Sequence, residues 1–205
     1  ERQTTRSAGQ EYRQDDRRGL VSLDLQNGGE TSDASFQYQY HKLDNYAFAA
    51  GSYESQSANL VNSLDFGPTL NRRWDSRINY YSRRGGADGT NLTNLDVSEF
   101  LVIDHNVERS SNYSYQLNRQ DTGFGISTSH SAIAQLIQQF YANLSIDGSV
   151  IAQRAELPDG TITTAGLAGG ANYHHRLPRD GNVQLSLGLG SLTTSSHVAA
   201  GAVQV

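Results

Sequence analysis

The chain has 205 residues with a formal net charge of −5, and 36% of its residues are hydrophobic. The negative charge and the scatter of its 16 lysines and arginines exclude a basic field that would attract nucleic acid. Cysteine is absent, which excludes disulfides, thiolate metal sites and cysteine nucleophiles together.

The hydropathy of the chain excludes a transmembrane helix but not a membrane barrel. No run of about 18 apolar residues occurs. In a membrane β-barrel only alternate residues face lipid, so a low average hydropathy is compatible with this fold. Methionine is also absent, including an initiator. We therefore expect a processed or excised chain that has lost a signal peptide.

Residues 1–19 are polar and lack periodicity, so we expect a flexible lead-in there, followed by a single β-barrel domain or barrel fragment over 20–205. After residue 20, apolar residues recur at every second position, which is typical of strands with one apolar face. Up to residue 126 the alternating sets are, in chain order, Val21, Leu23 and Leu25; Ala34, Phe36, Tyr38 and Tyr40; Tyr46, Phe48 and Ala50; Ala58, Leu60, Leu64 and Phe66; Leu70, Trp74, Ile78 and Tyr80; Leu95, Val97, Leu101, Ile103 and Val107; Tyr113, Tyr115 and Leu117; and Phe124 and Ile126.

Residues 131–141 are ambiguous, because part of the segment fits helical spacing and the residues after it return to period two. The helical pattern is carried by Ile133, Leu136, Ile137 and Phe140. We favour a turn at 131–138 and a long strand over a short helix. Residues 161–190 then predict a β-hairpin turning at Pro178–Asn182, and residues 197–205 predict one more strand.

The predicted fold is all-β: an antiparallel up-and-down transmembrane β-barrel with about 12 strands in this chain, or a part of a larger barrel. Short turns on one rim and longer loops on the other are typical of outer-membrane barrels. We expect short connections near residues 44, 68, 109 and 180, and longer or more polar ones near 30, 55, 88, 121, 159 and 194.

If the apolar residues face lipid, the residues between them line the interior of the barrel. That lining would hold Gln37, Gln39, Arg73, Asp75, Arg77, Asn79, Asp96, Asp104, Asn112, Gln116, Asn118, Asn143 and Asp147. Two charged residues, Arg72 and Glu99, have the parity of the apolar set. We expect Arg72 near a rim, whereas Glu99 lies in mid-segment and counts against a lipid-facing surface unless that surface meets another strand or subunit.

Tyrosine provides a further sign of a membrane wall. Rings with a polar tip suit the headgroup level of a bilayer, where aromatic girdles form. The tyrosines expected toward strand ends are Tyr38, Tyr40, Tyr46, Tyr80, Tyr81, Tyr113, Tyr115 and Tyr173. Tyrosine also has a high preference for β-strands, so it could occur at these positions without any membrane.

The sequence contains only weak motifs for metal binding or catalysis. His174 and His175 are adjacent, so in a strand they point to opposite faces and cannot share one metal ion. Asp104 and His105 could join a serine in a hydrolytic triad, but no Gly-x-Ser-x-Gly motif is present. We therefore expect no enzyme, no cofactor, and no catalytic, cofactor-binding or metal-binding residues.

Two segments resemble a known group of proteins. Val97–Val107, which leads into Asn112–Leu117, and Tyr173–Gly188 resemble segments of uncharacterised large porin-like outer-membrane β-barrel proteins of Gram-negative bacteria. That group shows hairpins of the form Tyr…Arg-Leu-Pro…Gly…Leu-Ser-Leu-Gly. Such barrels usually end on an aromatic residue, and this chain ends at Gly201–Val205, so we expect a part of a longer chain.

The resemblance implies a protein of the outer membrane that acts as a porin-like channel, conduit or scaffold. Its partners would be outer-membrane lipid and other envelope proteins or further subunits, multihaem cytochromes among them by analogy. Two alternatives stay open. One is a secreted or cell-surface β-rich structural or adhesion module, whose apolar face packs on a second sheet. The other is a barrel-embedded hydrolase.

Overall fold

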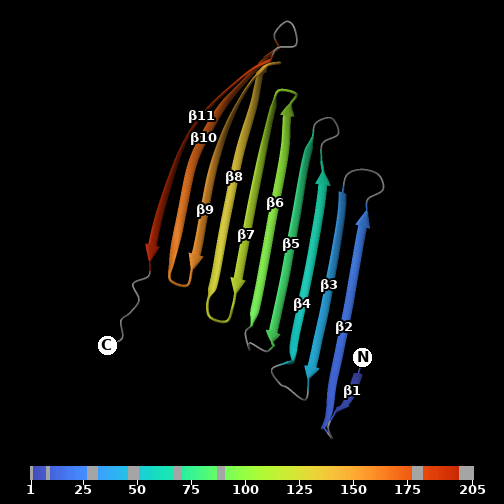
Figure 1. Cartoon of the computed structure of the whole chain (residues 1–205). Coiled ribbons are helices and arrows are strands. Elements are labelled where there is room, and N and C mark those ends of the chain that lie inside the picture. Colours follow the sequence, from blue (N-terminus) through green and yellow to red (C-terminus); the bar gives the residue numbers. More distant parts are fainter. Residues whose placement is uncertain are drawn as a thin grey trace, which may run out of the picture.

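The computed structural model describes residues 2–7, 10–26, 32–45, 51–66, 71–86, 91–176 and 182–198, which form one antiparallel sheet of 11 strands. Each strand is hydrogen-bonded to the next one in the chain (Figure 1). The strands are β1 (Arg2–Ser7), β2 (Gln10–Gln26), β3 (Ser32–Asn45), β4 (Tyr53–Asp65), β5 (Arg72–Gly85), β6 (Leu92–Asn106), β7 (Arg109–Asp121), β8 (Ile126–Tyr141), β9 (Leu144–Leu157), β10 (Gly160–Arg176) and β11 (Asn182–Val198).

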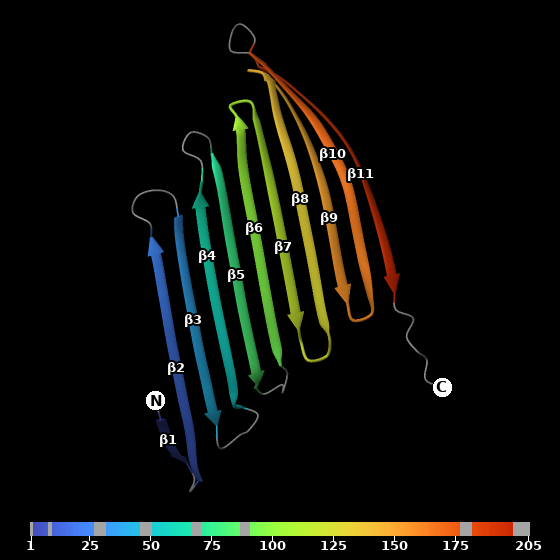
Figure 2. The same cartoon turned by 180° about the vertical axis from the view of Figure 1, so that it is seen from behind.

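Consecutive strands turn back at one of two edges of the sheet. The edge at the top of Figure 1 joins β2 to β3 and every second pair after them, and we call it the upper edge. The opposite edge, where β3 meets β4, is the lower edge; Figure 2 shows the same order from behind. Two-residue turns lie at 107–108 and 142–143 on the upper edge and at 158–159 on the lower edge. The short turn predicted near 109 is therefore confirmed, whereas the longer connection predicted near 159 is wrong, because the chain makes a two-residue turn there.

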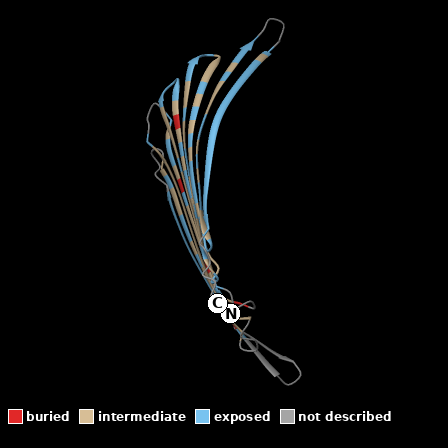
Figure 3. Ribbon diagram, turned by 90° about the vertical axis from the view of Figure 1, so that its left-hand side faces the viewer, coloured by how far each residue is buried: buried red, intermediate tan, exposed pale blue. Residues whose placement is uncertain are grey.

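Seen from the side, the sheet is a single bowed layer that does not close on itself (Figure 3). Among the described residues no hydrophobic side chain is buried. The buried polar residues are Asp15, Ser76, Ser82 and Ser111. A sheet normally buries one face against a second layer, and the described residues form no second layer. The prediction of an all-β, antiparallel, up-and-down chain is confirmed, whereas a closed barrel is not observed.

The predicted lead-in over residues 1–19 differs from the structure. Gln10–Gly19 is the first half of β2, and Arg2–Ser7 pairs with its beginning. Backbone pairing needs no apolar side chain, so polar residues can extend a strand beyond its apolar part. Hydrophobic periodicity marks only the apolar part, which explains why this half of the strand is not visible in the sequence.

The ambiguous segment 131–141 belongs to one strand. β8 runs from Ile126 through Tyr141, so the preference for strand over helix is confirmed. The expected turn at 131–138 is wrong, because the chain turns at Ala142 and Asn143. β8 is paired on both sides, with β7 and β9, and this pairing decides against the local helical spacing.

The remaining differences concern strand ends. The breaks predicted near 55 and 194 lie inside β4 and β11. The described residues after the predicted lead-in therefore form ten strands, β2 to β11, in place of about 12, and β1 is an additional strand within that lead-in. The strand predicted at 46–50, most of the turn at 178–182 and most of the strand at 197–205 lie outside the described residues. The described part contains no α-helix, and no helix in it is long and apolar enough to cross a membrane.

A pair of glycine substitutions tests the turn between β7 and β8. Gly123 has φ of +79°, which other residues adopt at a cost, whereas a Cβ at Gly148 would meet no atom within 4 Å. We expect Gly123→Ala to lower the free energy of unfolding by about 1–2 kcal/mol and Gly148→Ala to change it by less than about 0.5 kcal/mol. Denaturant unfolding measures both. Equal effects would contradict the left-handed conformation at Gly123.

Candidate functional site

One face of the sheet collects the alternating apolar residues of all strands from β2 to β11. Directly paired residues of antiparallel strands lie on the same face, so the register assigns each residue to a side. We call this surface the apolar belt. Its members are Val21, Leu23, Leu25, Ala34, Phe36, Tyr38, Tyr40, Ala58, Leu60, Leu64, Trp74, Ile78, Tyr80, Leu95, Val97, Leu101, Ile103, Tyr113, Tyr115, Leu117, Ala132, Ala134, Leu136, Leu144, Ile146, Val150, Ala152, Ala165, Leu167, Ala171, Tyr173, Leu185, Leu187 and Leu189.

The apolar belt slants across the sheet. The row of paired residues that starts at Leu23 in β2 reaches Ser195 in β11. The apolar residues of β11 are centred on Leu187, which lies eight residues from Ser195. Over nine strand steps the belt therefore shifts by about one residue per strand toward the upper edge. With ordinary strand spacings this shift corresponds to a slope of about 30° between the belt and the paired rows.

The lower boundary of the belt is aromatic and then charged. Tyr40 and Tyr80 are its last members on β3 and β5, and the row beyond them pairs Arg17, Lys42, Glu54 and Arg84. Most of the tyrosines predicted for a girdle are on the belt face. Tyr81 is not, because its neighbours place it on the opposite face, and Tyr46 lies outside the described residues.

The opposite face is polar, and its side chains bond to one another across the strands. Asn59, Asn79, Asp96 and Asn118 form one row over β4 to β7. Asn59 Nδ2 donates to Asn79 Oδ1 at 2.7 Å, and Asn118 Nδ2 donates to the Asp96 carboxylate. The register places the predicted polar set on this face, except Asn143, which lies in a turn.

An apolar row on the polar face was missed by the sequence analysis. It crosses β6 to β11 and contains Phe100, Ile133, Ile151 and Leu192. Each of them breaks the alternation of its own strand, which is the only signal that the sequence offers. The polar face is therefore not uniformly hydrophilic.

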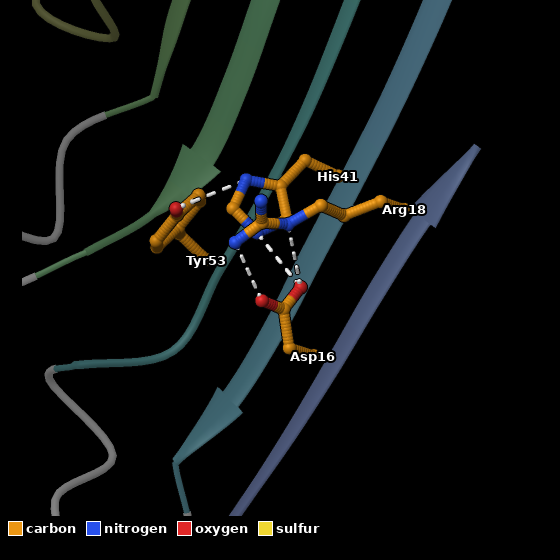
Figure 4. A network of polar contacts seen from close by, with 4 residues as sticks. All are labelled: Asp16, Arg18, His41 and Tyr53. Carbon is orange, nitrogen blue, oxygen red and sulfur yellow. Dashed lines mark hydrogen bonds and ion pairs between the residues drawn. The ribbon is translucent and has the colours of Figure 1, made fainter. Parts of the chain in front are cut away.

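A cluster of polar side chains joins β2, β3 and β4 on the polar face near the lower edge (Figure 4). Arg18 donates from Nη2 to Asp16 Oδ2 at 2.8 Å and from Nε to Oδ1 at 3.2 Å. His41 Nε2 lies 3.1 Å from Asp16 Oδ1, and its Nδ1 lies 3.1 Å from the Tyr53 hydroxyl. With the proton on Nε2, His41 donates to Asp16 and accepts the Tyr53 proton, so the imidazole is held from both sides.

Electrostatics stabilise the charged form of Asp16. The hydrogen bonds from Arg18 lower the pKa of the Asp16 carboxyl below its usual range, against an opposing effect of burial, and the charge of Arg18 and the hydrogen bond from His41 lower it further. The guanidinium of Arg83 lies 5.4 Å from the centre of the Tyr53 ring, a cation–π contact that extends the cluster to β5. The arrangement ties four strands together through side-chain contacts.

Glu99 lies among the apolar side chains of the belt, as its position in the alternating pattern predicts. Its carboxylate accepts hydrogen bonds from Trp74 Nε1 at 2.7 Å and from Ser76 Oγ at 2.8 Å. It borders an open hollow of about 610 Å³. Apart from Glu99 and Ser114 the hollow is lined by Phe66, Trp74, Leu101, Tyr113, Tyr115, Ala132, Ile133, Ala134, Val150 and Ala152. Arg72, the other exception, is the first residue of β5 and lies at the upper boundary of the belt.

The two histidines that are adjacent in the sequence are separated by the sheet. His174 pairs with Gln184 and His175 with Val183, so they point to opposite faces, and the His175 ring stacks on Tyr173. Within the described ranges no three His, Asp or Glu side chains are placed to hold a metal ion.

His105 contacts a serine hydroxyl, as the base of a hydrolase would. Its Nε2 lies 2.7 Å from Ser111 Oγ. Ser111 is only 3% exposed, and Asp104 pairs with Ser110 on the other face of the sheet. The hydroxyl is therefore shielded from a substrate, and Asp104 does not orient the imidazole.

The Asp16 cluster makes stability depend on pH. Because folding lowers the pKa of Asp16, its contribution to stability is present above the pKa of the unfolded chain and is lost as the pH falls through the lower, folded value. We expect the difference in melting temperature between the wild type and Asp16→Asn to shrink between about pH 5 and about pH 2. Asp24→Asn, on the same face of β2, removes the same charge and is the control. If both variants lost equal stability at neutral pH, the cluster would have no stabilising role.

Comparisons with known proteins give this sheet no counterpart. No family model, no curated protein and no solved structure matches the chain. The function of the sheet is therefore inferred from its own features: an apolar belt on one face, bonded polar rows on the other, and a charged cluster at the lower edge.

Proposed function

We propose that this chain forms the wall of a β-barrel in the outer membrane of a Gram-negative bacterium and acts as a porin-like channel, conduit or scaffold. The observation that carries the proposal is the slanted apolar belt. A belt that faces lipid must run level around a barrel whose strands are tilted, so it must cross the paired rows at an angle. A sheet packed on a second sheet has no such requirement.

The dimensions of the belt fit a bilayer. The slope of about 30° is close to the strand tilt of membrane barrels, 35–45°. On β6 the belt runs from Leu95 to Ile103, about 27 Å along the strand and about 23 Å after correction for the tilt. Apolar bands of membrane barrels are about 25 Å tall. Tyr40 and Tyr80, followed by Lys42 and Arg84, give the aromatic and charged boundary that a headgroup region favours.

The two outermost strands of the sheet support a larger wall. Within the described ranges, β11 pairs only with β10, and β2 beyond Asp15 pairs only with β3. Unpaired backbone groups in hydrocarbon cost several kcal/mol each. In a membrane, both outermost strands would therefore require further strands to pair with. The ten strands from β2 to β11 would form a continuous sector of such a barrel. Its interior would be lined by the polar face, where bonded amide and carboxylate rows suit a water-filled channel.

A secreted or surface-attached adhesion module is the second candidate, and Glu99 favours it. A carboxylate is better tolerated between two protein layers than against lipid. In that case the apolar belt would pack on a second sheet and the purified chain would be monomeric in water. In the membrane case it would partition into detergent and migrate differently on gels before and after heating.

Two adjacent substitutions on β11 separate the candidates. Leu187 is at the centre of the belt and Ser186 is on the polar face, and both are exposed. We expect Leu187→Arg to destabilise the protein folded in lipid vesicles by about 2–4 kcal/mol and Ser186→Arg to have an effect below about 0.5 kcal/mol. Denaturant titration in vesicles measures this difference. A chain that stays in the aqueous phase instead of floating with the vesicles would rule out the membrane proposal.

A further inference from the structure

Four strands carry the same ordered pair of charges at the lower boundary of the apolar belt. On the belt face, β2, β3, β7 and β9 each place a cation below their apolar positions and a carboxylate two residues further toward the lower edge. We call these the boundary pairs. They are Arg17 and Asp15, Lys42 and Asp44, Arg119 and Asp121, and Arg154 and Glu156. No strand in the described ranges has the reverse order at this boundary.

The cations of the boundary pairs lie at one level of the belt, although they belong to different paired rows. Arg154 is in the row of Leu23, six residues above Arg17, and β9 is seven strand steps from β2. Arg119 is in the row of Val21, four residues above Arg17, after five strand steps. This rise of about one residue per strand is the slope of the belt itself. Where the belt runs level, the cations therefore share one depth and the carboxylates share another, further from the hydrocarbon.

The boundary pairs are ion pairs at the surface. Lys42 Nζ lies 3.3 Å from Asp44 Oδ2, and Arg154 Nη2 lies 2.7 Å from Glu156 Oε1. The Arg154 and Glu156 side chains are 59% and 49% exposed. The β2 pair differs, because its Asp15 is buried. Exposed ion pairs add little to stability and do so in either order, so stability does not explain why one order repeats.

The complement of a boundary pair is a headgroup whose charges run in the opposite order. A phosphate next to the acyl chains meets the cation, and an ammonium on the water side of that phosphate meets the carboxylate. Two residues of a strand span about 6.8 Å, which is about 6 Å of depth at the slope of the belt. A headgroup with a phosphate alone would bring its negative charge close to the carboxylates without pairing them. At the upper boundary the cations Arg72 and Arg109 are the first residues of their strands, so this ordered pair does not occur there.

We propose that the boundary pairs bind the headgroups of zwitterionic phospholipids, with the phosphate on the cation and the ammonium on the carboxylate. The inference rests on the proposed function, since it requires the belt to face lipid. Each pair and each headgroup are two dipoles that lie side by side in opposite directions, which is an attractive arrangement. The lower edge of the wall is thereby assigned to the leaflet that carries such lipids.

The absence of cysteine from the chain allows a fluorophore to be attached at one chosen position. Thr163→Cys carries it, because Thr163 pairs with Arg154. The full chain is refolded into phosphatidylglycerol vesicles that contain a small fraction of lipid with a nitroxide quencher on its acyl chain, near an unmodified headgroup. Labelled phosphatidylethanolamine has the phosphate and the ammonium, and labelled phosphatidylglycerol has the phosphate alone. We expect phosphatidylethanolamine to quench about two- to threefold more strongly. Equal quenching by the two lipids would overturn the inference.

An exchange of the two charges within a boundary pair keeps the ion pair and the net charge but reverses their order. The test variant combines Lys42→Asp and Asp44→Lys on β3 with Arg154→Glu and Glu156→Arg on β9. We expect it to lose the preference for phosphatidylethanolamine, because the phosphate then meets a carboxylate and the ammonium meets a cation. A preference that survives this reversal would contradict the inference.

A second exchange is the matched control. Arg73 and Asp75 have the same spacing and a 2.9 Å ion pair, but they lie on the polar face. Arg73→Asp with Asp75→Arg should keep the lipid preference, and loss of the preference in this variant as well would show that the boundary pairs are not its cause. Denaturant titration in the vesicles establishes that each variant is folded.

Failure of the inference is distinguishable from failure of the proposed function. If the chain floats with the vesicles but shows no preference between the two lipids, the membrane wall stands and only the headgroup site is wrong. If the chain does not float, the wall proposal fails and the headgroup site fails with it.

Discussion

The hydrogen-bonded ladder between neighbouring strands is the interaction on which the whole structure depends. No hydrophobic side chain in the described ranges is buried, so no packed core holds the strands in place. Every pairing is between strands that follow each other in the chain. Side-chain contacts add to the ladder locally, as in the bonds of Asp16 with Arg18 and His41 or of Glu99 with Trp74. The ladder can persist without a core only if another medium or partner covers the apolar belt.

The register of the strand pairing determines which side chains lie on which face of the sheet. A slip of one residue between two strands would move every later side chain to the opposite face. Cross-strand bonds between side chains favour the observed alignment, for example Asn59 with Asn79 on the polar face and Ser76 with Glu99 on the belt face. Such pairs contribute little energy individually, but each one is lost in a slipped register. The polar rows therefore specify the alignment that also builds the belt.

The sequence predicted the two faces well and the ends of the strands poorly. Alternation with period two is a local property, so the belt and the polar face were readable residue by residue. The first half of β2 and the start of β4 are polar and are held by backbone pairing, which leaves no periodic signal. The Asp16 cluster could not be predicted, since His41 lies 25 residues from Asp16 and only the register brings them together. The sequence identifies Glu99 as an exception to the apolar pattern, but only the structure shows that Trp74 and Ser76 donate hydrogen bonds to it.

The nearest-neighbour order of the strands has a consequence for how such a sheet can change size. Each hairpin contacts only the hairpins beside it, so two consecutive strands can be duplicated or deleted as a unit. The chain would leave the unit in the direction in which it entered, and the rest of the sheet would keep its faces. Loss of a single strand would reverse the direction of every strand after it. Because the belt advances by about one residue per strand, an added hairpin lengthens it without bending it. Growth by hairpins widens such a sheet while the length of its strands stays constant.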